Sequence, residues 1–137
     1  MVTQHKKLET LGFILVLLMV LLQGFYGIFA YIEPANFADI RGTALISESD
    51  QDWVKIYGSR TIFITSILAY LLYSRNFVIL MWCALLGIVM PVSDALLAYN
   101  AEAATKVIIK HLATIIYLLL TYFVLRRINS QIKSKHQ

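Results

Sequence analysis

The sequence predicts an all-α protein: an antiparallel, integral membrane four-helix bundle with both termini cytoplasmic. Of its 137 residues, 59% are hydrophobic, whereas soluble domains are typically about 45–50% apolar. The apolar residues fall in four blocks, each close to the ~20 residues that cross a ~30 Å hydrocarbon core. Basic residues come directly before the first block and directly after the last one. We therefore expect one membrane domain, 1–137, with spans at about 11–31, 56–73, 77–99 and 103–125.

The first block, 11–31, is expected to be an uncleaved span. It exceeds the apolar core of a signal peptide, about 7–15 residues, and Ile28 stands where a cleavage site needs a small residue. Gln23 is its one strongly polar member, and Gly27 and Ala30 are small enough to let another helix come close. Because an amide in lipid needs a partner, Gln23 either bonds to a neighbouring helix or lines a pocket.

The segment 32–55 is expected to be an external loop. Its acidic residues outnumber Arg41 and Lys55. Seven basic residues lie on the other side of the predicted membrane, and positive charge marks the cytoplasmic side; they are Lys6, Lys7, Arg75, Arg126, Arg127, Lys133 and Lys135. Pro34 should end the first helix, and Phe37 and Ile40 are compatible with a short helical turn lying on the membrane.

Several kinds of function are disfavoured by the sequence. No basic stripe with interleaved aromatics is present, so we expect no nucleic-acid partner. The acidic loop matches no calcium motif, and the single cysteine, Cys83, gives neither a disulfide nor a cysteine metal site. Ser59 and Ser93 lack the context of a hydrolase nucleophile. We expect no metal and no cofactor.

Asp94 is the most informative residue of the third block, since a carboxylate at the centre of a span costs about 2.5–3.5 kcal/mol and normally has a partner. It lies five residues before Tyr99, about 7–8 Å below the outer end at ~1.5 Å per residue. Arg60 heads the second span and His111 lies early in the fourth. We expect Arg60 to neutralise Asp94 and His111 to bond to the same carboxylate.

Other features of these spans carry smaller predictions. The short turn at 74–76 makes the second and third helices antiparallel neighbours, and Pro91, one turn after Gly87, should kink the third. Lys106 and Lys110 are expected to point outward or pair with Glu102. Small polar residues at helical spacing mark a packing seam on the fourth helix: Thr114, Tyr117 and Thr121.

Three short motifs carry a family resemblance: Tyr57-Gly-Ser-Arg60-Thr, Asp94-Ala-Leu-Leu, and His111. Over roughly 24–126 the chain resembles small four-helix membrane proteins catalogued as domain of unknown function 4267, in the neighbourhood of the DoxX-like proteins. The resemblance implies an arginine at the head of the second helix, an aspartate late in the third and a histidine early in the fourth. Thr61 stands where that family often has an acidic or amide residue. No activity is implied.

Three functions stay open. The first is binding of a small lipophilic or amphiphilic ligand in an outward-facing pocket, with the site residues Arg60, Asp94, His111, Gln23, Tyr26 and Tyr57. The second is an accessory or assembly subunit, as a homodimer or with a membrane-protein partner, in which the charged cluster is structural. The third is an acid–base enzyme, isomerase-like, acting on a lipid or quinone-like substrate through Asp94 and His111. The expected location is the bacterial cytoplasmic (inner) membrane, in contact with membrane lipid.

Overall fold

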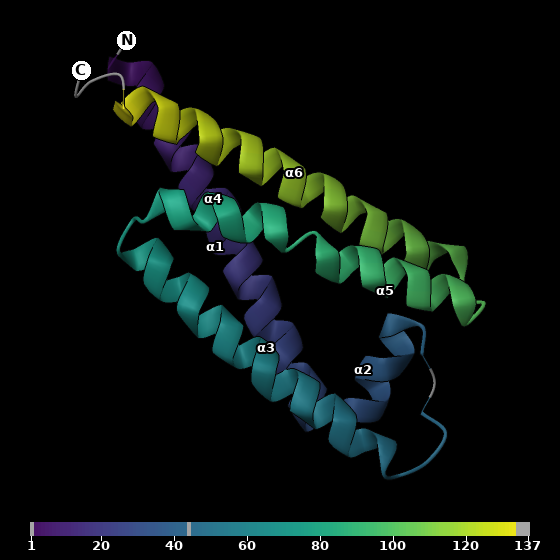
Figure 1. The fold of residues 1–137 in the computed structure, drawn as a ribbon. Helices are drawn as coiled ribbons and strands as arrows, with labels where there is room; N and C mark the ends of the chain where they lie inside the picture. Colours follow the sequence, from purple (N-terminus) through teal and green to yellow (C-terminus); the bar gives the residue numbers. More distant parts are fainter. Residues whose placement is uncertain (1, 44, 134–137) are drawn as a thin grey trace.

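A computed structural model describes residues 2–43 and 45–133, and the secondary structure in these ranges is entirely helical (Figure 1). Six helices follow one another along the chain: α1 (Val2–Ile32), α2 (Pro34–Arg41), α3 (Asp50–Tyr73), α4 (Phe77–Leu86), α5 (Val89–Asn100) and α6 (Thr105–Lys133). The chain termini lie at one end of the molecule, and α2 lies at the other (Figure 1).

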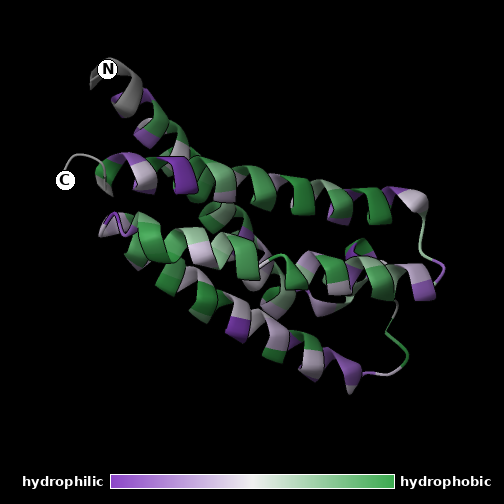
Figure 2. Ribbon diagram, turned by 45° about the horizontal axis from the view of Figure 1, so that its top comes forward, coloured by the Kyte–Doolittle hydropathy of each residue, from purple (hydrophilic) through white to green (hydrophobic). Residues whose placement is uncertain are grey.

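The predicted four-span membrane architecture is confirmed. Four segments are long and apolar enough to cross a bilayer: Lys6–Ile32, Asp50–Tyr73, Phe77–Asn100 and Thr105–Ile132. Hydrophobic residues cover much of the length of these helices, and hydrophilic residues gather mainly at their ends (Figure 2). The protein is therefore an integral membrane protein. The cytoplasmic placement of the termini stays a prediction from the charge bias, and Lys135, one of the charges counted, lies outside the described residues.

The spans are arranged as two helix pairs. α1 packs along α3, while α6 packs along α4 and then α5, and contacts between α1 and α6 join the pairs (Figure 1). α3 contacts α4 beside their connecting turn, but α3 and α5 make at most slight contact within the described residues. The second and third spans, predicted to be antiparallel neighbours, therefore contact each other near their connecting turn only. The main partner of α3 is α1.

Small residues set the close approach of α1 and α3. A Cβ atom built on Gly58 would lie 2.8 Å from the carbonyl oxygen of Gly27 and 3.3 Å from Cβ of Ala30. Glycine at these positions lets the two backbones touch, as is common between membrane helices. The expectation that another helix would come close beside Gly27 and Ala30 is confirmed.

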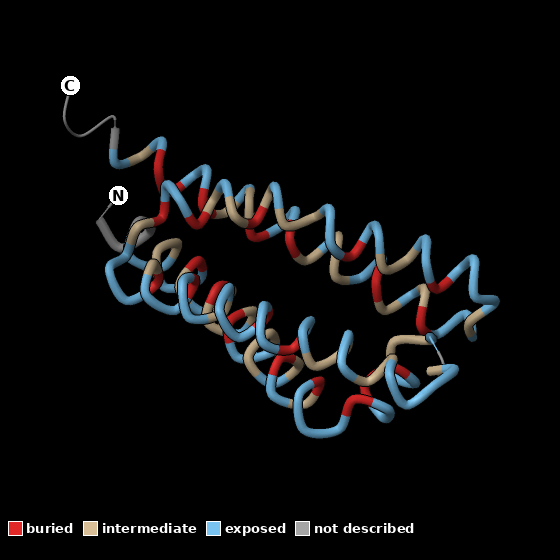
Figure 3. The backbone as a smooth tube through the Cα atoms, turned by 60° about the horizontal axis from the view of Figure 1, so that its bottom comes forward, coloured by how far each residue is buried: buried red, intermediate tan, exposed pale blue. Residues whose placement is uncertain are grey.

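The main apolar core lies in the half of the molecule that contains the termini. Its buried side chains come from α1, α3, α4 and α6: Val16, Val20, Leu68, Leu72, Phe77, Leu80, Leu125 and Ile128. Buried residues face the neighbouring helices, and exposed residues cover the outer faces (Figure 3). Many exposed residues are large and apolar, Phe25, Phe63 and Leu120 among them, which suits surfaces that face lipid.

The third span is broken where the sequence predicts a kink. α4 ends at Leu86, Gly87 and Ile88 form a turn, and α5 begins at Val89. Pro91 has no N–H to donate to the carbonyl of Gly87, and its ring would clash with that carbonyl in a regular helix. The break therefore falls four residues before the proline.

The polar seam of α6 is satisfied within the protein. The hydroxyl of Thr114 donates to the carbonyl of Lys110, and that of Thr121 donates to the carbonyl of Tyr117. The Tyr117 hydroxyl donates across to the carbonyl of Leu15 on α1. Two of these hydrogen bonds lie within α6 and the third connects α6 to α1, as expected of a packing seam.

Candidate functional site

Asp94 on α5 is held by Arg41, the last residue of α2. The Arg41 guanidinium donates from Nη2 to Oδ2 of Asp94 and forms an ion pair with it. The two side chains are 17% and 27% exposed, so the pair is mostly shielded. The prediction that Arg60 neutralises Asp94 is wrong, because Arg41 of α2 takes that place.

Arg60 lies away from this pair. Its side chain is exposed on α3 and makes no hydrogen bond or ion pair within the described residues. Gly58 and Thr61 are buried on the same helix. At 100° per residue, Arg60 is turned about 200° from Gly58, which places it off the packed face.

The structure brings α2 to Asp94 through local sequence features. Pro34 occupies the first position of α2, where its missing N–H costs no helical hydrogen bond. Gly42 ends the helix in the left-handed conformation, with φ of 81°. A Cβ on Gly42 would lie 2.7 Å from Cβ of Ala103. The short helical turn predicted around Phe37 and Ile40 is thus a complete helix, and Gly42 presses its end against the start of the fourth span.

His111 also lies close to Asp94. It is buried, and its Nδ1 lies 3.9 Å from Oδ2 of Asp94, beyond hydrogen-bond distance. Its Nε2 is buried without a hydrogen-bond partner in the described part of the chain. The prediction that His111 bonds to Asp94 is therefore wrong, although the structure brings the two residues close together, with Arg41 as the third member of the cluster.

Lys110 also belongs to this neighbourhood. Its Nζ donates to the carbonyl oxygen of Ile40 at 2.8 Å. It therefore caps the end of α2, where a cation is favourable. The expectation that Lys110 points outward or pairs with Glu102 is wrong, whereas Lys106 is exposed.

Aromatic side chains surround the guanidinium. The Arg41 carbon Cζ lies 5.7 Å from the ring centre of Phe37 and 5.9 Å from that of Tyr57. Phe37 is buried, and its ring lies 5.4 Å from Tyr57 and 6.1 Å from both Tyr26 and Phe29. The faces of aromatic rings attract cations, so the rings stabilise the charge of Arg41.

A small pocket of ≈130 Å³ opens beside this cluster. It is lined by Phe37, Arg41, Thr43, Tyr57, Asp94 and Leu97. Two of the predicted site residues, Tyr57 and Asp94, line it. Tyr26 reaches it only through Phe37, and His111 does not line it. Gln23 is half-buried, makes no hydrogen bond with the described residues and does not line the pocket.

The pocket residues that sequence reasoning missed are Arg41, Phe37, Thr43 and Leu97. Arg41 had been counted with the charges of a loop. The signal that points to it is the order Phe37, Ile40, Arg41, Gly42, an apolar helical turn that ends in a cation and a glycine. Because such a turn is apolar, it is expected to fold back onto the bundle. Its last side chain then reaches the level of the membrane spans.

These features define a class: a four-span membrane protein in which the short helix α2 lies beside a charged, aromatic-lined pocket. The chain belongs to the family described as Domain of unknown function (DUF4267), whose model matches residues 20–125. The matched region includes Arg41, Asp94 and His111. No curated protein and no solved structure matches the chain. Kinship with the DoxX-like proteins stays a prediction.

Proposed function

We propose that the protein binds a small lipophilic or amphiphilic molecule in the pocket beside Asp94. One observation carries the proposal: a single pocket joins the Arg41–Asp94 pair to the apolar side chains of Phe37, Tyr57 and Leu97. Ligand pockets are typically apolar cavities with a few placed polar groups that fix orientation. An amphiphile offers the matching parts, a polar head and an apolar body.

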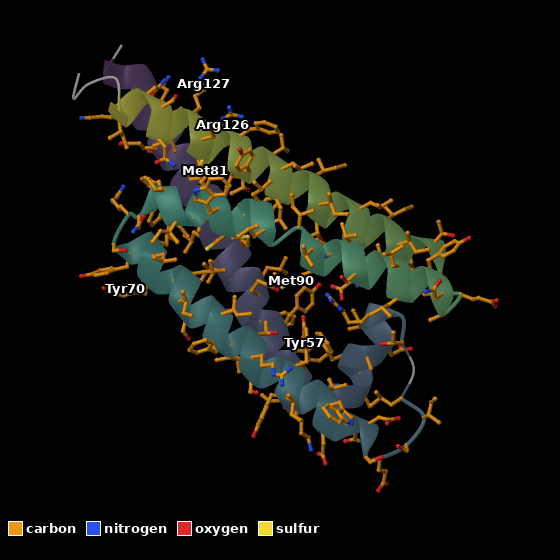
Figure 4. The ribbon with its side chains drawn as sticks, viewed as in Figure 1. Tyr57, Tyr70, Met81, Met90, Arg126 and Arg127 are labelled. Atoms are coloured by element: carbon orange, nitrogen blue, oxygen red, sulfur yellow. The ribbon has the colours of Figure 1, made fainter. Side chains whose placement is uncertain are left out.

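The arrangement of the helices supports entry from the bilayer. Because α3 and α5 make at most slight contact in the described residues, the outer halves of the two helix pairs are joined mainly through α2. Tyr57 of α3 and Met90 of α5 lie between the pairs (Figure 4). Leu97 lines the pocket and is exposed on a membrane span, which supports entry of an apolar body from lipid.

Binding accounts for the geometry better than acid–base catalysis does. His111, the candidate proton carrier, is buried and does not line the pocket. A catalytic base must come within about 2.6–3.2 Å of the proton that it takes, directly or through one water. We further propose that the pocket faces outward from the bacterial cytoplasmic membrane, since the basic ends of the chain favour the inner side.

The proposal is tested with the full chain in nanodiscs and a set of dodecyl amphiphiles that carry anionic, neutral and cationic heads. Leu97 lines the pocket and Leu96 does not, yet they are 59% and 60% exposed. L97A should weaken binding of the best probe by about fourfold or more, the value of one buried CH₂ group. L96A should leave the Kd of the best probe unchanged.

Native mass spectrometry and calorimetry on wild type, L97A and L96A measure this difference. Equal Kd values for L97A and wild type, or no binding by any probe, would contradict the proposal. The charged cluster would then be an ion-pair network that holds the helices.

A further inference from the structure

We infer that the ligand is an anionic amphiphile whose head group binds the free donors of Arg41. This inference rests on the proposed function and adds the charge of the ligand and the direction in which it lies. Two features of the cluster carry it: the unused hydrogen-bonding capacity of Arg41 and the net charge around Asp94.

Arg41 has donors to spare. A guanidinium carries five N–H groups, and within the described residues Arg41 donates from Nη2 to Asp94 only. Its side chain is 17% exposed and lines the pocket, so its other donors are free to bind a ligand there. The fork of a guanidinium matches a carboxylate or phosphate group, which it binds with two parallel bonds.

The local charges also favour an anion. Arg41 and Lys110 carry one positive charge each and Asp94 carries one negative charge, so with neutral His111 the cluster has a net charge of +1. The nearby acids Asp39 and Glu102 are exposed to solvent. One anionic head group would neutralise the cluster, whereas a cationic head group would be repelled.

The pocket fixes the direction of the ligand. Its ≈130 Å³ is well below the ~300–1,000 Å³ of pockets that enclose a drug-sized molecule. It therefore holds the head group and the first carbons. Leu97 and Tyr57 form the apolar wall, and Met90 lies farther along between the helix pairs (Figure 4). The chain of the ligand would run from Arg41 past these residues into lipid.

The test compares dodecanoate and dodecyl phosphate with neutral dodecanol, using the full chain in phosphatidylcholine nanodiscs. The measured quantity is the ratio of the anion's affinity to that of dodecanol. We expect this ratio to be at least about ten, the size of one charge-assisted hydrogen bond. Because both affinities come from the same protein sample, the ratio is insensitive to partial loss of folded protein.

Four variants test whether this affinity ratio depends on the charges of the cluster. R41Q should reduce it about tenfold, and K110Q should reduce it by a smaller factor because Lys110 bonds to Ile40 rather than to the pocket. D94N should raise it, because it removes a competing carboxylate. R60Q removes the same charge from exposed Arg60 outside the cluster and should leave the ratio unchanged. Should R41Q yield no folded protein, K110Q and D94N decide the sign of the effect.

The outcomes separate the inference from the proposed function. A ratio near one, or a lower ratio in D94N, would overturn the anionic head while amphiphile binding stood. Failure of every probe would remove the proposed function as well. Inorganic phosphate or acetate binding as tightly as the dodecyl anions would overturn the amphiphile, since the site would then take free anions. Selective binding of dodecanoate or of dodecyl phosphate would support the inference and identify the head group.

Discussion

At the scale of single residues, the stability of the partly buried carboxylate of Asp94 depends on a partner 53 positions away in the sequence. Asp94 and Arg41 are both mostly shielded, so removing either leaves the other charge with poor compensation. His111 at 3.9 Å is too far to replace Arg41 by a direct hydrogen bond. Asp94 therefore depends on the folding of α2 as well as on the spans.

A double-mutant cycle tests this dependence. R41Q and D94N should each lower the free energy of unfolding, and the double variant should lose less than the sum. We expect a coupling energy of about 1–3 kcal/mol, because residues in one ion pair couple by about 0.5–3 kcal/mol. Unfolding in mixed micelles, followed by circular dichroism, gives the four values. The cycle of R60Q with D94N is the control and should be additive; additivity in the Arg41 cycle would show that the pair does not stabilise the protein.

The residue scale also shows what the sequence can predict about the site. Asp94 and His111 meet because each lies near the outer end of adjoining helices, and depth follows from residue counting at ~1.5 Å per residue. The depth of a residue does not by itself show which arginine pairs with Asp94, because the direction of a side chain depends on which face of its helix is packed. Gly58 and Thr61 mark the packed face of α3. A helical projection that starts from these small residues places Arg60 on a different face.

At the scale of elements, α2 joins the two helix pairs. It packs against α1 and α3, while Arg41 binds Asp94 of α5 and the carbonyl of Ile40 accepts from Lys110 of α6. The break between α4 and α5 is the second feature at this scale. It could be predicted because Pro91 acts locally, whereas the docking of α2 depends on residues distant in sequence.

G42A tests the docking of α2. Gly42 has φ of 81°, and an added Cβ would lie 2.7 Å from Ala103 and 3.1 Å from Val107. Left-handed backbone costs a residue with a side chain about 1–2 kcal/mol, and the clash adds to this cost. We expect lower stability and faster proteolysis within 34–49, measured by limited digestion and mass spectrometry.

The matched control for G42A is G24A. An added Cβ on Gly24 would lie 3.3 Å from the side chain of Thr65, and this glycine lies inside α1 rather than at the end of α2. G24A should leave the digestion of 34–49 close to wild type. Equal protection of this segment in G42A and wild type would show that α2 holds its place without this contact.

At the scale of the whole molecule, the four spans and the common side of the termini followed from the sequence because bilayer thickness fixes the length of a span. The pairing of the helices did not follow. It depends on which faces carry small residues such as Gly27 and Gly58, and in lipid no contrast between apolar and polar surfaces selects the partner. Arg126 and Arg127 lie on α6 near the termini, away from α2 (Figure 4), so the charge bias maps onto the two ends of the bundle.

This distribution of charge predicts how the protein sits in the membrane, and cysteine labelling in intact bacterial cells measures it. In a C83A background, which removes the single native cysteine, S49C places a thiol before α3 and S74C places one in the turn between α3 and α4. Both serines are exposed and lie at opposite ends of one span. If positive charge is inside, a membrane-impermeant maleimide should label S49C in intact cells and S74C only after permeabilisation. The reverse pattern would turn the pocket toward the cytoplasm, and its ligand would then have to come from the inner leaflet.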